Sequence, residues 1–308
     1  MIQNSLVKPF LKWVGGKTQI IDKIIDKFPK EINDYHEPFL GGGSVLFALL
    51  SLIQNKEIKL NGNIYAYDLN ERLINVYKHI QNNKDELWEY LNKLINDYNN
   101  IELDNVEKQD NKRKNINPQT EVEGKISKEH YYYYIRNLYN NSKNNIKISA
   151  MFIFLNKTCF RGVYRESKNG FNVPYGNYKN PSIMTKDILD NISQILKDVI
   201  FMNSSFNESL SNVFKKKDFV YLDPPYAPEN SKSFVGYTKD GFTYDNHIEL
   251  FNKIKILKEN NIKFAMSNAK VDLVLEKFDD CIIEEVKAKR AINSKKPDSK
   301  TIEVIVYN

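Results

Sequence analysis

An aspartate, two prolines and a tyrosine stand together at Asp223–Tyr226, and side chains of these types can do chemistry as a group. They follow the run Asp218–Leu222, whose apolar residues predict a buried strand. Two consecutive prolines cannot continue a strand, so the chain must turn out of the sheet at Pro224 and Pro225. We therefore expect a carboxylate, proline carbonyls and the Tyr226 ring at the carboxyl-terminal edge of a sheet, where open α/β sheets bind ligands.

This group suits the methylation of an amine attached to an aromatic ring, such as adenine N6. The lone pair of that amine is delocalised and weakly nucleophilic, and acceptors aimed at both N–H bonds localise it and offset the charge that develops during attack. Asp223 offers one acceptor, the Pro224 carbonyl offers the other, and Tyr226 offers a face for stacking. A sulfonium methyl donor requires neither a metal nor a covalent enzyme intermediate. The motif alone is equally compatible with a strand that is merely capped by aspartate and closed by prolines.

Length and composition set the outer limits. The 308 residues, 41% of them hydrophobic, suffice for one large α/β domain or two smaller ones. Lys and Arg exceed Asp and Glu by 45 to 39, an excess that permits nucleic-acid binding without establishing it. Cys159 and Cys281 are far apart and the four histidines are scattered, so we expect neither a metal site nor a disulfide. The sequence has no evident signal peptide or apolar run of membrane-spanning length, and we expect a cytoplasmic, DNA-associated protein without a membrane partner.

Two adjacent glycines, Gly15 and Gly16, lie near the start of the chain and are followed by Lys17-Thr18. This resembles the end of a phosphate-binding P-loop, but that motif requires a glycine where Leu11 stands, which argues against nucleotide triphosphate binding. The pattern instead predicts a glycine turn and then an amphipathic helix over Thr18–Phe28. Trp13 and Lys17 flank the turn, where the backbone can approach a ligand closely.

A second glycine loop, Gly41–Gly43, follows a short predicted strand that begins at Tyr35. Ser44 can cap the helix expected to run to Ile53. Strand, glycine loop and helix form a cofactor cradle, but Leu46 stands where the dinucleotide fingerprint requires its third glycine. The loop therefore suits S-adenosylmethionine better than NAD, and a tight turn without a ligand is the plainer alternative.

The next predicted strand, Asn63–Asp68, ends in an acid. At this distance from a glycine loop, a carboxylate can accept hydrogen bonds from both ribose hydroxyls of a cofactor. Asp68 can equally cap the helix that begins near Asn70, and the two roles are compatible.

The middle of the chain changes character twice. Helical periodicity over Leu69–Asn99 gives way to the polar stretch Ile101–Lys128, which predicts a loop or insertion, and helical patterns resume at Lys128–Tyr139 and Ile146–Leu155. Residues Asn156–Pro181 then interleave arginines, aromatics, asparagines and turn residues. That composition is typical of a base-reading loop or β-hairpin, and equally of a loop whose aromatics pack while its arginines face water.

The last third predicts the rest of an α/β domain. We expect a polar, aromatic loop after the Asp-Pro-Pro-Tyr motif, able to close over a substrate, and a basic loop that could contact phosphates. The expected elements are a helix at Ile188–Leu196, a strand at Val199–Met202, the loop Ala227–Asp245, a helix at Asp245–Lys258, a strand at Lys263–Ser267, an antiparallel pair at Cys281–Val286 and Thr301–Tyr307, and the basic loop Lys287–Lys300.

Taken in order, these motifs resemble the Dam-type (D12 class) DNA adenine-N6 methyltransferase family over most of the chain. Asp-Pro-Pro-Tyr alone is shared by many amino-methyltransferases, whereas the flanking motifs are much more specific. The matching segments are FLKWxGGK at Phe10–Lys17, PFxGGG at Pro38–Gly43, the acid at Asp68, FNVPxGxY at Phe171–Tyr178, Asp223–Tyr226, and RxINS at Arg290–Ser294.

The resemblance implies a Rossmann-like α/β fold with S-adenosylmethionine as cofactor, and methyl transfer to adenine N6 in double-stranded DNA after base flipping. It implies a discontinuous catalytic domain, residues 1–76 and 188–308, and a helical and β-hairpin target-recognition insertion, residues 77–187. The catalytic residues carried over are Asp223, Pro224, Pro225 and Tyr226. The cofactor-binding residues are Trp13, Lys17, Glu37, Phe39, Gly41, Gly43, Asp68 and Asp223. The DNA-binding residues are Lys17, Phe160, Arg161, Val163, Arg165, Asn172 and Pro174.

The chain also departs from the family. Members often carry an acid before the position of Phe206, where this chain has Ser204-Ser205, and the spacing from Arg165 to Phe171 differs slightly from some members. Two alternative functions remain open. One is an RNA or other amine methyltransferase on the same core, and the other is a DNA-binding relative without turnover. GATC is the recognition sequence that the resemblance suggests, and a cognate restriction endonuclease is a possible partner.

Overall fold

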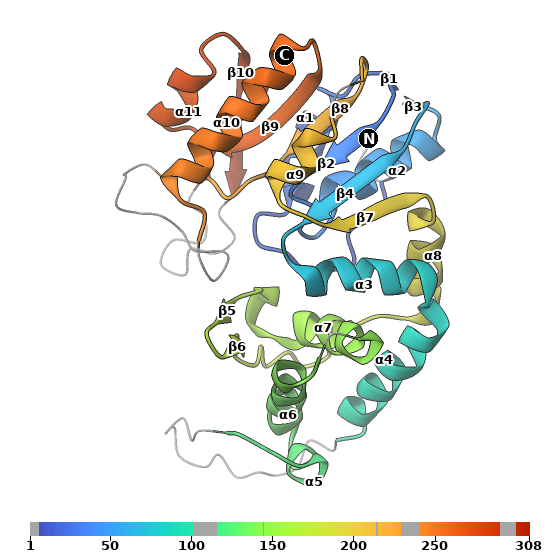
Figure 1. The fold of residues 1–308 in the computed structure, drawn as a ribbon. Coiled ribbons are helices and arrows are strands. Elements are labelled where there is room, and N and C mark those ends of the chain that lie inside the picture. Colours follow the sequence, from blue (N-terminus) through green and yellow to red (C-terminus); the bar gives the residue numbers. More distant parts are fainter. Residues whose placement is uncertain (1–5, 102–115, 144, 214, 229–240, 290–299) are drawn as a thin grey trace. The chain divides into compact units, whose positions relative to one another are not determined.

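The computed structural model describes residues 6–101, 116–143, 145–213, 215–228, 241–289 and 300–308. The chain divides into two compact units (Figure 1). The first unit comprises Met1–Pro9, Gly15–Asn70 and Asp198–Asn308, and the second comprises Phe10–Val14 and Glu71–Lys197. Each unit is therefore assembled from segments that are distant in sequence.

The first unit is built on a seven-stranded sheet with the order β10-β11-β9-β8-β2-β4-β7. The strands are β2 (Tyr35–Glu37), β4 (Ile64–Asp68), β7 (Val199–Asn203), β8 (Phe219–Leu222), β9 (Lys263–Ala269), β10 (Ile282–Lys289) and β11 (Lys300–Tyr307). The five neighbouring strands β9, β8, β2, β4 and β7 pair in parallel, whereas β11 is antiparallel to both β9 and β10. This mostly parallel sheet confirms the expected Rossmann-like α/β class.

Helices cover both faces of this sheet. Val220 and Leu222 of β8 pack into one core with α9 (Phe206–Ser211), α10 (Tyr244–Glu259) and α11 (Asp272–Lys277). The alternate side chain Phe219 faces the other way, where the ring of Phe28 lies 4.6 Å from its ring. Because both faces are covered, β8 is buried along its whole length, as its uninterrupted apolar sequence predicts.

The start of the first unit is more broken than its periodicity predicts. Instead of one helix over Thr18–Phe28, the chain forms the 3₁₀ turn η2 (Lys17–Gln19) and the short helix α1 (Ile21–Ile25). The apolar residues of the pattern are nevertheless buried. The sequence therefore predicts which side chains are buried here, but not the length of the helix. The helix α2 (Ser44–Gln54) follows the glycine loop as expected, and β1 (Glu31–Ile32) pairs in parallel with β3 (Lys59–Leu60).

The second unit is mainly helical. Its helices are α3 (Glu71–Asn82), α4 (Lys84–Asn99), α5 (Glu121–Gly124), α6 (Lys128–Asn141), α7 (Ile146–Thr158) and α8 (Lys186–Leu196). α7 packs against α3, α4 and α6, which explains why it is apolar on nearly all sides. Phe10–Val14 joins this unit because the Asn156 side chain holds both backbone groups of Lys12, accepting from its N–H at 2.9 Å and donating to its carbonyl at 2.7 Å.

A small hairpin completes the second unit. Strands β5 (Glu166–Ser167) and β6 (Gly170–Phe171) pair antiparallel, after the 3₁₀ turn η3 (Phe160–Gly162). Asn140 of α6 clamps the hairpin, accepting from the Phe171 N–H at 2.9 Å and donating to the Phe171 carbonyl at 3.0 Å. Gly170 has a φ of +86°, and a side chain there would collide with Asn140.

Three sequence features fall wholly or partly outside the described residues. Residues 102–115 of the polar stretch Ile101–Lys128 are not described, nor are residues 229–240 of the loop Ala227–Asp245. Residues 290–299 of the basic loop Lys287–Lys300, which include the Arg290–Ser294 motif, are not described either. Among the helices that are described, none is long and apolar enough to cross a membrane.

Candidate active site

The carboxyl ends of the parallel strands bring several candidate residues of the first unit to one sheet edge. Strand order reverses between the neighbouring strands β2 and β8, because β4 continues on one side and β9 on the other. Glu37 is the last residue of β2 and Asp223 directly follows β8. Both carboxylates therefore lie at a topological switch point, where open α/β sheets bind ligands.

Asp223 is held by a buried lysine. The ammonium of Lys17 lies 2.7 Å from Asp223 Oδ2 and also donates to the Gly15 carbonyl at 2.5 Å. Burial raises the pKa of Asp223 to about 6, the Glu303 carboxylate adds to the rise, and the Lys17 ammonium opposes it. Asp223 is thus largely ionised at neutral pH and can accept a hydrogen bond.

Tyr226 is oriented by groups on both sides of the motif. Its hydroxyl donates to Glu303 Oε2 of β11 at 2.7 Å, and the Lys17 ammonium lies 5.0 Å from the centre of its ring. Burial and the Asp223 and Glu303 carboxylates raise the pKa of Tyr226 well above its ordinary value. The hydroxyl therefore stays protonated and remains a donor.

Glu37 is a buried carboxyl at the same edge. The Tyr35 hydroxyl donates to Glu37 Oε2 at 2.7 Å. Burial raises the pKa of Glu37 to about 8, the Tyr35 hydrogen bond opposes the shift, and the Asp223 carboxylate adds to it. A cation placed beside Glu37 would favour its ionised form.

The glycine loop and Asp68 form a second part of this edge. Asp68 Oδ2 accepts from the Gly41 N–H at 2.9 Å, and Asp68 Oδ1 accepts from the Asn70 N–H at 2.8 Å. Burial raises the pKa of Asp68, and these two backbone bonds oppose the shift. The acid therefore joins the two connections that leave β2 and β4. Its bond to Asn70 lies before α3, which begins at Glu71, and a helix-capping role for Asp68 stays a prediction.

The expectation that Ser44 caps α2 is wrong. Gly43, with φ of +70°, occupies the N-cap, and Ser44 is the first residue of the helix. The Ser44 hydroxyl instead accepts from the Lys17 N–H at 3.0 Å. The first glycine turn is thereby attached to the second glycine loop, a link that the two separate motifs did not predict.

Aromatic rings border the glycine loop. The Phe39 ring lies 6.0 Å from that of Phe206 and 6.1 Å from that of Phe242. At the serines that replace the common acid of the family, Ser205 caps α9 by accepting from the Glu208 N–H. That serine therefore serves the helix, while Phe39 and its neighbours offer an apolar surface.

Sequence reasoning missed two polar residues that hold the Asp-Pro-Pro-Tyr turn. Asn268 of β9 is fully buried, and its Oδ1 accepts from the Ala227 N–H at 3.0 Å. Glu303 of β11 holds Tyr226. The available signal was a polar residue inside a mostly apolar strand, at Asn268 in Lys263–Ala269 and at Glu303 in Lys300–Tyr307.

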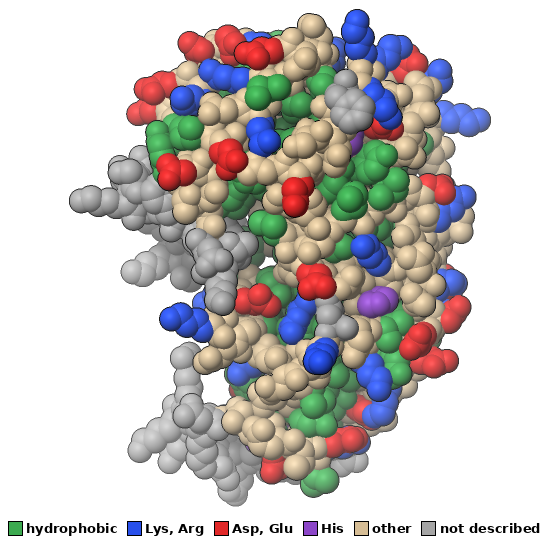
Figure 2. Space-filling view, in the orientation of Figure 1, with side chains coloured by type: hydrophobic (Ala, Val, Ile, Leu, Met, Phe, Trp, Pro, Cys, Tyr) green, Lys and Arg blue, Asp and Glu red, His purple; other side chains and the backbone are tan. Residues whose placement is uncertain are grey.

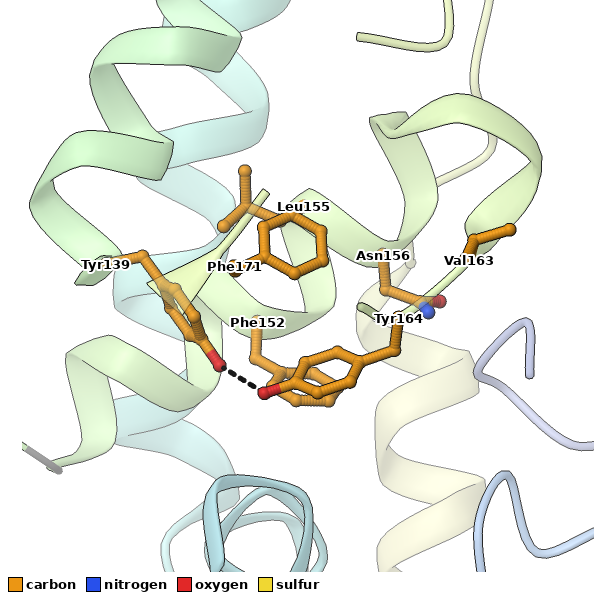
Figure 3. A pocket seen from close by; sticks show the side chains of 7 residues that line it. All are labelled: Tyr139, Phe152, Leu155, Asn156, Val163, Tyr164 and Phe171. Carbon is orange, nitrogen blue, oxygen red and sulfur yellow. Dashed lines mark hydrogen bonds between the residues drawn. The ribbon is translucent and has the colours of Figure 1, made fainter. Parts of the chain in front are cut away.

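Trp13 belongs to the second unit, unlike the other candidate cofactor residues. Its ring stacks on Tyr164 at 5.4 Å and on Phe152 at 6.3 Å. Phe152 and Tyr164 also line a cavity of about 10 Å³, room for little more than one water (Figure 3). This apolar cavity is too small for a cofactor, and the cofactor-binding role of Trp13 stays a prediction.

The candidate DNA-binding residues of η3 are exposed. Phe160 is 48% exposed, and the guanidinium of Arg161 lies 5.2 Å from its ring. Arg161 itself has a φ of +56°, and its N–H donates to the Tyr178 hydroxyl at 2.9 Å. Val163, just after this turn, is half-buried. The turn thus presents an aromatic and a guanidinium together at the surface.

The hairpin adds a bonded pair of polar side chains. Arg165 Nε donates to Asn172 Oδ1 at 2.7 Å, and both residues flank the two short strands. The Pro174 carbonyl accepts from the Phe160 N–H at 2.8 Å, which ties η3 to the end of the hairpin. The second unit therefore gathers the candidate residues from Phe160 to Pro174, while the other one, Lys17, belongs to the first unit.

Among the described residues, Asp34, His36 and Asp218 could together hold a metal ion. Asp34 and Asp218 precede β2 and β8, so this cluster lies at the opposite end of these strands from Asp223. Asp34 already accepts from the Asn63 N–H at 2.7 Å and pairs with Lys215 at 2.7 Å. These bonds give the carboxylate a structural role, and the absence of a metal from the reaction stays a prediction.

Surface charge adds little to the assignment. On the face drawn in Figure 2, the basic and acidic side chains of the described residues are interspersed. The excess of basic residues therefore does not mark a nucleic-acid footprint on that face.

A Rossmann-like sheet with a glycine loop after β2 and an Asp-Pro-Pro-Tyr turn after β8 defines the class as a methyltransferase. The model of the D12 class N6 adenine-specific DNA methyltransferase family matches residues 13–292, and the chain belongs to this family. The resemblance found in the sequence is thereby confirmed, and the protein is a site-specific adenine DNA methyltransferase.

Individual relatives match along nearly the whole chain. Type II methyltransferase M.MjaIII of Methanocaldococcus jannaschii is 40% identical, over 94% of each chain. Type II methyltransferase M1.LlaDCHI of Lactococcus lactis subsp. cremoris is 30% identical, over 98% of this chain and 95% of the relative. A DNA adenine methylase of Haemophilus influenzae is 30% identical, over 93% of this chain and 88% of the relative.

Proposed function

We propose that the enzyme transfers a methyl group from S-adenosylmethionine to adenine N6 within a short sequence of duplex DNA, with the target base flipped out of the helix. One observation carries this proposal: the Asp223 carboxylate lies at the switch point of the sheet, with Tyr226 held beside it. Adenine N6 is otherwise paired inside the duplex, so access to this edge requires the base to leave the stack.

The first unit has the donor and acceptor groups that the cofactor requires. Gly41 and Gly43 have φ of +49° and +70°, which lets the loop backbone turn tightly beside Asp68. We assign the ribose hydroxyls to Asp68 and the cationic amino group to Glu37, whose raised pKa such a cation would lower. Phe39 would pack against the cofactor, and Lys17 would hold the neighbouring acid. When bound, the cofactor supplies an electrophilic methyl group.

The residues of the chain prepare the amine for attack. Asp223 accepts one N–H of the adenine amine and the Pro224 carbonyl accepts the other, which localises the nitrogen lone pair and offsets the developing positive charge. Pro225 fixes the turn, and Tyr226 stacks on the flipped base. Because Lys17 occupies Asp223 Oδ2, we assign the amine to Oδ1. The extra proton can leave after transfer, so Asp223 need not be a strong base.

We assign DNA reading to the second unit, within the proposed insertion at residues 77–187. Exposed Phe160 can enter the base stack, and Arg161 and Arg165 can pair with guanine edges. Asn172, now bonded to Arg165, can pair with adenine, while Val163 and Pro174 would shape the contact surface. The catalytic domain, residues 1–76 and 188–308, would then supply the chemistry and the DNA contact of Lys17.

We also infer a biological setting. Two relatives are named type II methyltransferases, and such a role pairs methylation with protection of DNA from a cognate restriction endonuclease. The enzyme would then work on DNA inside the cell.

A methyl-transfer competition tests the proposed function. Tritiated S-adenosylmethionine is incubated with the enzyme, and unmodified duplex DNA competes with structured RNA for the label. We expect incorporation into the duplex alone, and Trp13→Ala and Glu37→Gln should weaken cofactor binding measured by calorimetry. Label in the RNA instead would favour an RNA methyltransferase, and cofactor binding without transfer to either would favour a binding role.

A further inference from the structure

We propose that Glu303 is a positioning residue of the methyl-transfer reaction, which holds the Tyr226 ring in place for the flipped base through the Tyr226 hydroxyl. This inference rests on the proposed role of Tyr226. It concerns a residue of the last strand, far in sequence from the Asp-Pro-Pro-Tyr motif and from both glycine loops.

The geometry begins with strand β11. In register, Glu303 of β11 lies opposite Ala269, at the carboxyl end of β9. Its neighbours Val304 and Ile305 are fully buried, whereas Glu303 is half-buried and faces the motif. The Tyr226 hydroxyl donates to Glu303 Oε2 at 2.7 Å, the usual length of an O–H···O hydrogen bond. A rigid sheet strand thus anchors the far end of the ring.

The backbone of the turn has its own anchor on the neighbouring strand. Asn268 of β9 accepts from the Ala227 N–H at 3.0 Å and from the Ala269 N–H at 2.8 Å. The backbone after Tyr226 therefore does not depend on Glu303. What the Tyr226–Glu303 bond determines is the direction of the ring, which matters only if the ring meets a ligand.

The charge of Glu303 has an effect that is separate from its hydrogen bond to Tyr226. Glu303 contributes to raising the pKa of both Asp223 and Tyr226, so its carboxylate is close to each. A carboxylate beside Asp223 disfavours the ionised acceptor that the reaction requires. Glutamine would accept the same hydrogen bond without the charge, so Glu303→Gln separates the position of the Tyr226 ring from the charge beside Asp223.

The test compares Glu303→Ala, Glu303→Gln, Tyr226→Phe and the double variant Glu303→Ala/Tyr226→Phe in single-turnover methyl transfer. Glu285→Gln is the matched control, because this exposed glutamate of the neighbouring strand β10 pairs with Lys270 instead. Affinities for S-adenosylmethionine and for duplex DNA, and the melting temperature, are measured for every variant. Formation of N6-methyladenine by the unaltered enzyme is checked first, because its absence would refute the proposed function and not this inference alone.

We expect Glu303→Ala and Tyr226→Phe each to lower the transfer rate by about 10- to 100-fold, the effect of losing one hydrogen bond to a charged group. The double variant should lose no more than either single variant, and cofactor affinity should stay within about twofold. Glu303→Gln should recover most of the rate and shift its acid limb to lower pH, since Asp223 then faces Lys17, Glu37 and Tyr221 without the charge of Glu303.

Three results would overturn the proposal. One is a normal rate in Glu303→Ala. Another is a double variant whose loss is the product of the two single losses, because the two residues would then act independently. The third is a loss in Glu303→Ala that is matched by weaker binding of both ligands and a lower melting temperature, which would indicate a structural role.

Discussion

The candidate site residues of the two units differ in how far they are exposed. At the sheet edge of the first unit, Glu37 is buried, Asp223 and Asp68 are half-buried, and burial raises the pKa of each. In the second unit, Phe160 and Arg161 lie exposed on a short turn. Enclosed carboxylates with raised pKa values suit chemistry on a small group, whereas exposed planar side chains suit contact with a large partner. This difference is what we expect if catalysis and DNA reading are carried by separate parts of the chain, as proposed above.

Replacing Asp223 by alanine should have the largest effect. The variant loses the acceptor that orients the amine, and we expect the rate of transfer to fall by about 1000-fold, as for removal of one preorganised polar group from an active site. Duplex binding, measured by fluorescence anisotropy, should stay within about twofold if the second unit reads the DNA. Transfer at the normal rate would disprove the assigned mechanism.

Replacing Phe160 by alanine tests whether the second unit binds DNA. Loss of an exposed ring that enters the base stack should weaken duplex affinity by about 5- to 100-fold, while leaving cofactor affinity unchanged. Val122→Ala is the control, because Val122 of α5 is 81% exposed in the same unit. Equal effects of the two substitutions would mean that Phe160 has no special contact with DNA.

Replacing Asp68 by asparagine should weaken the cofactor specifically. The amide keeps one acceptor for the backbone but loses the charge that would receive ribose hydroxyls, and we expect the dissociation constant for S-adenosylmethionine to rise about tenfold. Calorimetry measures this change. A matching loss of duplex affinity would show that the two functions are not divided between the units.

The smallest effect is expected from pH. Asp223 accepts a hydrogen bond only when ionised, and its pKa is raised to about 6. Transfer at ligand concentrations well below saturation, which reports groups of the free enzyme, should therefore be half-maximal near that pH and fall about tenfold per unit below it. The charged groups around Asp223 are Lys17, Glu37 and Glu303, and coupling to Glu37, whose pKa is raised to about 8, would broaden the curve. A rate that stays flat down to pH 5 would contradict the requirement for an ionised Asp223.

The first unit was largely predictable from sequence. The run Phe219–Leu222 and the prolines after it define a buried strand and its exit, and β2, β4, β7, β9 and the final antiparallel pair confirm the expected strands. Short elements such as α9 and α11 were missed, because too few residues repeat to show a period. Glu303 was missed as a site residue because its role depends on strand pairing, which brings distant segments together.

The second unit was less predictable at the level of single contacts. The composition of Asn156–Pro181 predicted a loop or hairpin, and the hairpin β5–β6 is present. The bond from Arg165 to Asn172 and the clamp by Asn140 depend on turn geometry, which composition does not specify. The stack of Trp13 on Tyr164 also joins residues that no local pattern connects.

The most direct test of the division between the units is to map methylated adenines in unmodified DNA treated with the unaltered enzyme or with Arg165→Ala. The account predicts N6-methyladenine in one short motif for the unaltered enzyme. For Arg165→Ala it predicts N6-methyladenine still, with at least one position of the motif relaxed, because the chemistry stays in the first unit. An unchanged motif in the variant, or methylation of an atom other than N6, would contradict the account.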